Sequence, residues 1–141
     1  MDDKIECIEW PNGSKEWYKN GKLHRTDGPA IELVSGYKEW WIDGNRHRTD
    51  GPAVEWWDGS NQWWQNGNIH RTDGPAIERS NGEKEWWVNG NIHRIDGPAV
   101  ERSNGEKEWW LNNIYYYSFS EWCDELNLSQ EEKCELVLIY G

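Results

Sequence analysis

The chain has little of what membrane-spanning or secreted proteins need. None of its 141 residues lies in an apolar run that approaches the roughly 18 residues of a transmembrane helix. The first ten residues, MDDKIECIEW, are acidic and lack the apolar stretch of a secretory signal. We therefore expect no membrane association.

Cysteine is also scarce, with copies only at Cys7, Cys123 and Cys134. An odd number of cysteines without the short spacing of a metal site does not predict a disulfide framework. Reduced thiols are typical of the cytoplasm, so we expect a cytoplasmic protein, in the host cytoplasm if the protein is viral.

Basic residues are outnumbered. The chain has 15 lysines and arginines against 26 aspartates and glutamates, and its formal net charge is −11. Direct nucleic-acid binding needs a basic surface, so we do not expect it. An acidic protein could imitate DNA, but its charge would then lie along an extended face. Here much of the charge lies at the ends, with −3 in residues 1–9 and −5 in residues 118–141, which disfavours imitation.

Tryptophan, by contrast, is abundant, and its positions show an internal repeat. Five of the 13 tryptophans lie 23 residues apart, at Trp17, Trp40, Trp63, Trp86 and Trp109. Histidines and glycines keep the same step. A fixed period of this kind is the signature of a repeat architecture. Five units cover about residues 8–117.

Each unit contains two turn signals between strand-like segments. A three-residue turn at Ser80-Asn81-Gly82 sets Glu78 opposite Lys84, whereas a two-residue turn would set like charges opposite each other. The second signal, Asn89-Gly90, is typical of a two-residue hairpin turn. In the fourth unit we therefore expect three strands, at about 75–79, 83–88 and 91–94.

Alternation of side chains assigns the two faces of a unit. One face of the fourth unit is expected to carry Ile77, Trp87 and Ile92. The same scheme predicts three cross-strand pairs on this face, namely Glu16–Arg25, Glu39–Arg48 and Glu85–Arg94. The opposite face would carry Ala76, Trp86, Val88 and His93. We expect the Ile77 face to form the main core, although a one-residue slip would exchange the faces.

Beyond Asn113 the repeat ends and helical patterns begin. Ser129 and Glu132 have the spacing of a capping box, which predicts the start of a second helix. The first helix has apolar residues at helical spacing, and so does the second: Phe119, Trp122, Cys123 and Leu126, then Leu136, Leu138 and Ile139.

These patterns predict a mainly β protein of two parts. Residues 1–117 would form an array of stacked antiparallel β-hairpin or meander repeats, flat or curled. Residues 118–141 would form two short helices that cap its last strand. The alternative is a helical hairpin that docks a partner. A homodimer could form through an open sheet edge or through the helical tail.

The fourth unit also carries a specific motif, EWWVNGNIHRIDGPAVE. It resembles a repeat family of tailed phages and giant viruses, whose units follow G-x-x-x-W-W/Y-x-N-G-x-x-H-R-x-D-G-P-A and are similar in outline to MORN-type repeats. The resemblance covers about residues 8–117 and implies a viral accessory protein with a stacked-hairpin fold and no assigned chemistry. The first unit lacks the H-R-x-D-G-P-A segment before Ile8, and the fifth has Tyr116-Tyr117 in place of His-Arg, as end units of an array should.

A histidine, an arginine and an aspartate recur together in this motif. Catalysis would need a single nucleophile or cleft, but the set is present in four copies and no serine or cysteine recurs beside it. Each copy offers one histidine and one aspartate, fewer than the three or four ligands of a zinc site. We therefore expect a protein that is not an enzyme and that has no cofactor and no metal.

Binding residues are expected where the copies differ. After the Ile/Val-Glu pair, the early units are apolar and the later units basic, which selects Trp10, Leu33, Trp56, Trp57, Arg79 and Arg102 as partner contacts. A second candidate face combines aromatic residues with histidines, namely Trp40, Trp63, Trp86, His47, His70 and His93.

We infer two functional hypotheses from these residues. The first is a non-catalytic accessory protein that binds another protein, such as a host or host-defence factor, through its β face. The alternative is capture of a small ligand (a sugar, a cation or a nucleotide signal) in Trp/Tyr/Arg pockets between repeats.

Overall fold

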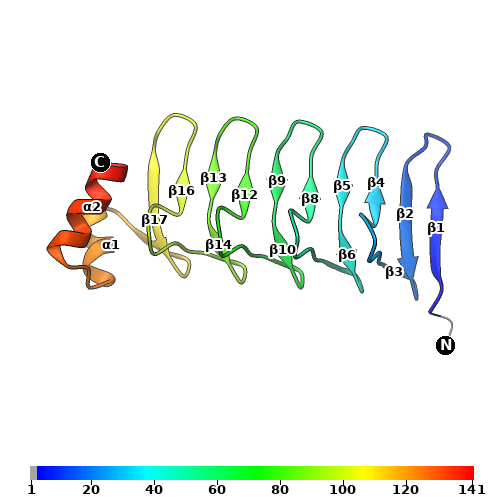
Figure 1. Ribbon diagram of the computed structural model, residues 1–141, viewed down its shortest axis with the longest axis horizontal. Helices are drawn as coiled ribbons and strands as arrows, with labels where there is room; N and C mark the ends of the chain where they lie inside the picture. The colour runs from blue at the N-terminus through cyan, green and yellow to red at the C-terminus, as the bar shows by residue number, and fades with distance from the viewer. Residues whose placement is uncertain (1–2) are drawn as a thin grey trace.

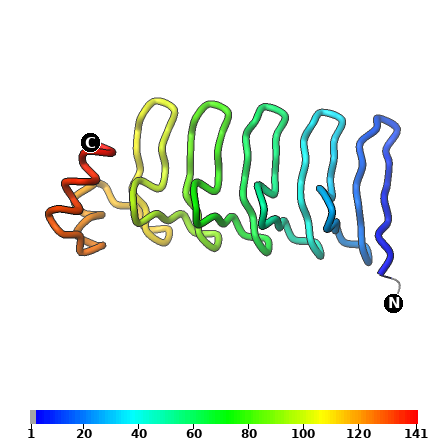
Figure 2. Tube along the Cα trace, in the orientation of Figure 1, coloured from blue at the N-terminus to red at the C-terminus, as the bar shows by residue number. Residues whose placement is uncertain are grey.

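The computed structural model describes residues 3–141. Figure 1 shows an elongated array in which β-hairpins lie side by side, with β1 at one end and the two helices at the other. The trace in Figure 2 shows the same hairpin path repeated along the long axis. The predicted fold class, mainly β with antiparallel hairpins and two C-terminal helices, is confirmed.

One twelve-stranded antiparallel sheet runs the length of the array. Its first half consists of β1 (Ile5–Glu9), β2 (Lys15–Lys19), β3 (Lys22–Leu23), β4 (Ile31–Glu32), β5 (Lys38–Glu39) and β8 (Val54–Glu55). Its second half consists of β9 (Asn61–Gln62), β12 (Ile77–Glu78), β13 (Lys84–Glu85), β16 (Val100–Glu101), β17 (Lys107–Leu111) and β18 (Ile114–Tyr116).

Short second hairpins branch from this sheet in the three middle units. They are β6 (Trp41–Ile42) with β7 (Asn45–Arg46), β10 (Trp64–Gln65) with β11 (Asn68–Ile69), and β14 (Trp87–Val88) with β15 (Asn91–Ile92). In the two end units the second hairpin stays in the main sheet, as β2–β3 and β17–β18.

Both predicted turns are confirmed. Glu78 lies opposite Lys84, and Gly82 at the end of the three-residue turn has φ +90°, in the left-handed region. At the second turn Trp87 lies opposite Ile92, and both Asn89 and Gly90 have positive φ. A two-residue turn with two positive φ values matches the twist of the strands it joins.

The register aligns opposite charges across neighbouring hairpins. On one face Lys38 lies between Glu32 and Glu55, and Lys84 lies between Glu78 and Glu101. Each such cross-strand pair contributes about 0.2–1 kcal/mol, and a shifted register would place like charges opposite each other. The charge rows therefore help to fix the stacking of one unit on the next.

The strand expected at 83–88 is divided at Trp86 into β13 and β14. The N–H of Trp86 donates to the carbonyl of Ala99 in the main sheet at 2.8 Å, and its own carbonyl accepts the N–H of His93 at 3.0 Å. Trp86 thus joins the sheet to the branching hairpin, and regular alternation ends there.

This break explains why the three predicted pairs Glu16–Arg25, Glu39–Arg48 and Glu85–Arg94 are wrong. The N–H of Arg94 donates to Trp110 of the next unit at 3.2 Å, so the chain has already left its own hairpin. The Arg94 guanidinium lies 3.8 Å from the centre of the Trp86 ring, on the opposite face from Glu85.

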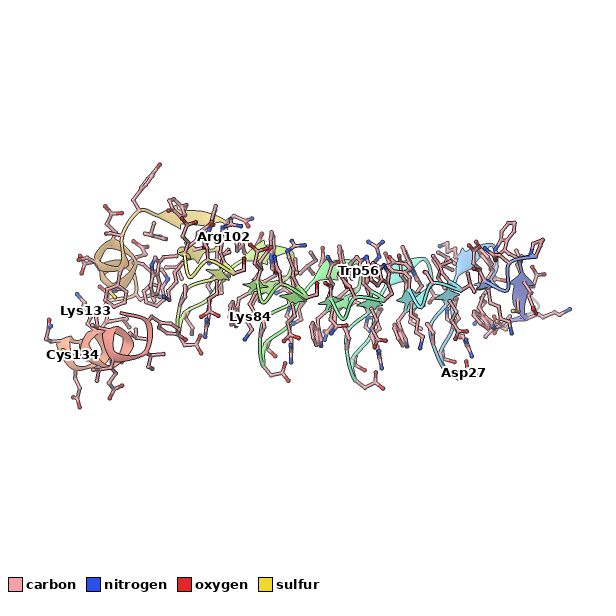
Figure 3. All side chains as sticks on the ribbon, turned by 90° about the horizontal axis from the view of Figure 1, so that it is seen from above. Asp27, Trp56, Lys84, Arg102, Lys133 and Cys134 are labelled. Atoms are coloured by element: carbon pink, nitrogen blue, oxygen red, sulfur yellow. The ribbon has the colours of Figure 1, made fainter. Side chains whose placement is uncertain are left out.

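Neither face alone forms the core, which corrects the expectation for the Ile77 face. That face buries Val54, Ile77, Ile92 and Val100. The opposite face carries Trp86 and its equivalents in the other units and is termed here the tryptophan face. It buries the four alanines of the repeat completely: Ala30, Ala53, Ala76 and Ala99. The sheet is one layer thick along the repeats (Figure 3), and among residues 3–141 only the two helices at its C-terminal end pack on it as a further layer, so elsewhere the long side chains of each face must cover it.

Two helices, α1 (Phe119–Glu125) and α2 (Gln130–Tyr140), follow the last hairpin. The predicted capping box of Ser129 and Glu132 is present. Trp122 and Cys123 are fully buried, in a cluster with Trp109 of β17. The helices therefore cover the tryptophan face of the fifth unit.

The apolar side predicted for α2 is only partly correct. Leu136 and Tyr140, one helical turn apart, pack against the cluster around Trp109, but Leu138 is 88% exposed and Ile139 68% exposed. No helix in residues 3–141 is long and apolar enough to cross a membrane.

Replacing Trp122 by alanine should destabilise the C-terminal end strongly. The side chain is fully buried against Trp109, and loss of a buried aromatic ring costs about 3–5 kcal/mol. Thermal unfolding followed by circular dichroism should show a large drop in Tm for W122A. The control W57A removes an indole that is 74% exposed and should leave Tm almost unchanged. Equal effects of the two variants would contradict the packing described above.

Candidate functional site

Each H-R-x-D-G-P-A segment forms a loop organised by its arginine, termed here the arginine loop. In the third unit, Arg71 Nε donates to Asp73 at 2.9 Å, and Nη1 donates to the carbonyl of Pro75 at 2.9 Å and to Glu78 at 3.2 Å. The guanidinium carbon lies 3.9 Å from the centre of the Trp63 ring. The loops of Arg25, Arg48 and Arg94 stack on Trp17, Trp40 and Trp86 in the same way.

The glycine of the loop makes room for this arginine. A Cβ atom added at Gly74 would lie 2.9 Å from Arg71 Cζ, and the copies at Gly28 and Gly51 are similarly close to their arginines. The backbone of these glycines is not left-handed, in contrast to the turn glycines. The Asp-Gly-Pro sequence therefore serves close packing on the arginine rather than an unusual φ.

The histidines connect successive units. Nδ1 of His70 accepts the backbone N–H of Asn89 in the next unit at 3.0 Å, and the other three copies make the same contact: His24 with Asp43, His47 with Asn66, and His93 with Asn112. An Nδ1 that accepts this bond carries no proton, so the contact of His47, His70 and His93 fits the ring with its hydrogen on Nε2. Nδ1 of His24 also lies 3.0 Å from a carboxylate oxygen of Asp43.

Residues of the second candidate face, which combines aromatic residues with histidines, line grooves between neighbouring units. One cavity of about 670 Å³ lies between the loop of Arg25 and the next unit's Trp40, His47 and Arg48 (the 25/48 groove). Another of about 530 Å³ lies between the loop of Arg71 and Trp86, His93 and Arg94 (the 71/94 groove). Trp63 and His70 occupy the equivalent positions of the third unit.

The first candidate set forms a row at the tips of the main hairpins. Trp10, Leu33, Trp56, Arg79 and Arg102 take the same position in successive units, and Figure 3 shows Trp56 and Arg102 on one side of the sheet with Asp27 of an arginine loop on the other. The row changes in character along the array, from apolar side chains to arginines.

At the apolar end, four side chains remain open to solvent. Trp10 is 47% exposed, Leu33 39% and Trp57 74%; Val34, which precedes Trp57 by one repeat, is 71% exposed. These four residues are termed the hairpin-tip surface. Sequence reasoning did not select Val34, although the 23-residue step marks it as the equivalent of Trp57. Trp56 is not part of this surface, because it is half-buried and packs edge-on against Tyr37, with ring centroids 5.6 Å apart.

At the basic end, the two arginines are paired. Arg79 Nη2 donates to Glu85 at 3.0 Å, and Arg102 Nε donates to Glu108 at 2.9 Å. The last two units thus fill the tip position with an ion pair, whereas the first two leave the exposed apolar side chains of Trp10 and Leu33 there, and the third has the half-buried Trp56.

No protein-family model matches the chain, and no curated protein matches it in sequence. Within residues 3–141 no three histidine, cysteine, aspartate or glutamate side chains gather as a metal site would require. The grooves and the hairpin-tip surface are the features of this chain that could bind a ligand or a partner.

The second unit contains a buried polar cluster that sequence reasoning missed. Glu39, only 5% exposed, accepts hydrogen bonds from Trp41 Nε1 at 2.6 Å, from Arg46 Nε at 3.0 Å and from the Tyr37 hydroxyl. Burial and the bond to Glu39 raise the pKa of Tyr37. The sequence carried one sign of this cluster. Arg46 is a charged residue at a repeat position that holds Leu23, Ile69 and Ile92 in other units.

Arg46→Ile should destabilise the protein although it restores the apolar residue of the neighbouring units. The variant leaves the buried Glu39 carboxylate without its guanidinium, which costs about 2 kcal/mol. The double variant E39Q/R46I copies Gln62 and Ile69 of the third unit and should recover most of the loss. Chemical denaturation of the three proteins measures this, and a double variant no more stable than R46I would refute the explanation.

Acid should weaken the arginine loops. The hydrogen bond from the loop arginine lowers the pKa of Asp27, Asp50 and Asp73. A pKa that is lower in the folded state gives stability that is present above the unfolded value, about 3.9, and is lost as pH falls through the folded value. We expect Tm to fall below about pH 4, and D27N/D50N/D73N to reduce that dependence relative to the surface control E106Q/E131Q/E135Q. An unchanged pH profile in the aspartate variant would show that these bonds do not contribute.

Proposed function

We propose that the protein is a non-catalytic binding protein that engages another protein through the hairpin-tip surface. The observation that carries this proposal is the exposure of four large apolar side chains at the tips of three neighbouring hairpins. Trp10, Leu33, Val34 and Trp57 come from three consecutive hairpins, and each is at least 39% exposed. Neighbouring exposed apolar side chains mark interaction sites, and tryptophan is enriched among residues that dominate binding energy.

The fourth and fifth units support this proposal by comparison. Arg79 with Glu85 and Arg102 with Glu108 show that the repeat tolerates a charged pair at the tip position. Ser80 and Ser103 occupy the position of Val34 and Trp57 in these two units. Exposed tryptophan, leucine and valine are therefore not a requirement of the fold. An apolar tip in the first three units is best explained by a partner that covers it.

The contacts of the repeated histidine, arginine and aspartate support the non-catalytic part of the proposal. In each copy the histidine accepts a backbone N–H of the next unit and the arginine donates to the aspartate of its own loop. General acid–base catalysis needs groups free to exchange protons with a substrate, whereas these groups hold the array together.

The motif that resembles phage and giant-virus repeats adds an expectation about the partner. A viral accessory protein acts on its host, so a host protein, including a defence factor, is the partner class that we propose. The net charge of −11 favours a partner with a basic surface around an apolar patch.

Polar substitution of the tips should abolish partner capture without loss of fold. We expect W10S/V34S/W57S to keep the wild-type circular dichroism spectrum and to lose the proteins that the wild type retains from lysates of candidate host cells, quantified by mass spectrometry. The matched control L138S/I139S removes similarly exposed apolar groups from α2, and this variant should still capture the proteins that the wild type retains. The proposal fails if the tip variant captures the same proteins as the wild type, or if the α2 variant loses them equally.

A further inference from the structure

The helical cap places a tyrosine against the last arginine loop. The hydroxyl of Tyr140 accepts a hydrogen bond from Arg94 Nη2 at 2.7 Å. Its ring meets Trp109 of the next unit edge-on, with centroids 6.2 Å apart. A Cβ added at Gly97 would lie 2.6 Å from the hydroxyl, so the loop glycine provides the space that the phenol occupies.

The same three groups recur in the two open grooves. In the 71/94 groove, Arg71 and Gly74 take the places of Arg94 and Gly97, and Trp86 takes the place of Trp109. The 25/48 groove repeats the arrangement with Arg25, Gly28 and Trp40. Volumes of about 530 and 670 Å³ leave ample room for a phenol ring.

The arginines of the open grooves also keep a donor available. Nε and Nη1 of Arg71 bond to groups of its own loop and β12, as do those of Arg25 with the corresponding groups. Among residues 3–141, Nη2 of Arg25 and Nη2 of Arg71 have no hydrogen-bond partner, whereas Nη2 of Arg94 bonds to Tyr140. An unused donor in a cavity favours a ligand with an acceptor at that point.

We propose that the 25/48 and 71/94 grooves each bind a tyrosine side chain presented by a protein partner. The hydroxyl accepts a hydrogen bond from Nη2 of Arg25 or Arg71, and the ring lies between the loop glycine and the tryptophan of the next unit. Tyr140 in the cap is the intramolecular example of this contact. None of the four residues of the hairpin-tip surface lines either groove, so this proposal does not depend on that surface.

The charges of the groove select a neutral phenol over an anion. The 71/94 groove is lined by two arginines, Arg71 and Arg94, and by two aspartates, Asp73 and Asp96. Each arginine is also paired with a glutamate, Arg71 with Glu78 at 3.2 Å and Arg94 with Glu101 at 3.8 Å. A phosphate or carboxylate would add negative charge where carboxylates are already in excess. A phenol accepts the same hydrogen bond without that repulsion.

The open grooves should also bind a tyrosine side chain more tightly than a phenylalanine side chain. Trp109 is covered by the apolar ring of Trp122, but Trp86 is covered by the Arg94 guanidinium. The open grooves are therefore more polar than the filled one, and the hydroxyl contributes a larger share of recognition.

Nuclear magnetic resonance of the full chain tests this with three probes: N-acetyltyrosinamide, N-acetylphenylalaninamide and N-acetylphosphotyrosinamide. We expect saturable shifts of the Nε–H signals of Arg25 and Arg71 and of the indole signals of Trp40 and Trp86. The tyrosine probe should bind about fivefold more tightly than either other probe, the ratio given by one net hydrogen bond. Equal binding of tyrosine and phenylalanine probes, tighter binding of the phosphorylated probe, or no saturable response to the tyrosine probe would overturn the proposal.

Filling one groove at a time provides the internal control. Ile42 lines the 25/48 groove and Val88 lines the 71/94 groove, and neither accepts a hydrogen bond from Arg25 or Arg71. I42F should abolish the response of Arg25 and leave that of Arg71 intact, and V88F should do the reverse. Loss of both responses in each variant, or of neither, would count against separate sites. W10S/V34S/W57S should keep both responses, which distinguishes this site from the hairpin-tip surface.

Discussion

The stacking of a loop arginine on a tryptophan is the interaction on which this array depends. A single-layer sheet has no second layer to bury its apolar groups, so each unit must cover its own face. In four loops the guanidinium lies 3.8–3.9 Å from a tryptophan ring centre while it donates to an aspartate and a proline carbonyl. The arginine side chain thereby orders the loop and covers the ring. The backbone N–H of the same residue donates to the next unit and so connects neighbours.

The end of the array shows what happens when this arginine is missing. The fifth unit has Tyr117 at the arginine position, and that side chain is 86% exposed. Phe119, Trp122 and Tyr140 of the helices cover Trp109 instead. Repeat arrays need such terminal caps because their last unit has no neighbour to complete its core.

Differences between copies carry more functional information than the shared motif. The shared histidine, arginine and aspartate are engaged with each other or with backbone in each of their four copies, whereas the tip position varies from Trp10 to Arg102 without disturbing the register. The polar cluster of Glu39 and the phenol of Tyr140 are further single-copy features. Because the repeat fixes the backbone, each such variation changes the surface at a known position and little else.

The sequence by itself determined the period, the turns, the register and the helical cap, because these depend on local rules. Glycine and asparagine at positive φ set the turns, opposite charges such as Glu78 and Lys84 select the register, and Ser129 with Glu132 starts α2. It also located the tip row by simple spacing. Only the tertiary structure decided the partners of the arginines, the sharing of the core between both faces, the exposure of Leu138 and the grooves. The reason is that alternation holds within a strand, and the chain leaves its strand at Trp86; beyond that point the position of Arg94 is set by Trp110 of the next unit, which no local pattern encodes.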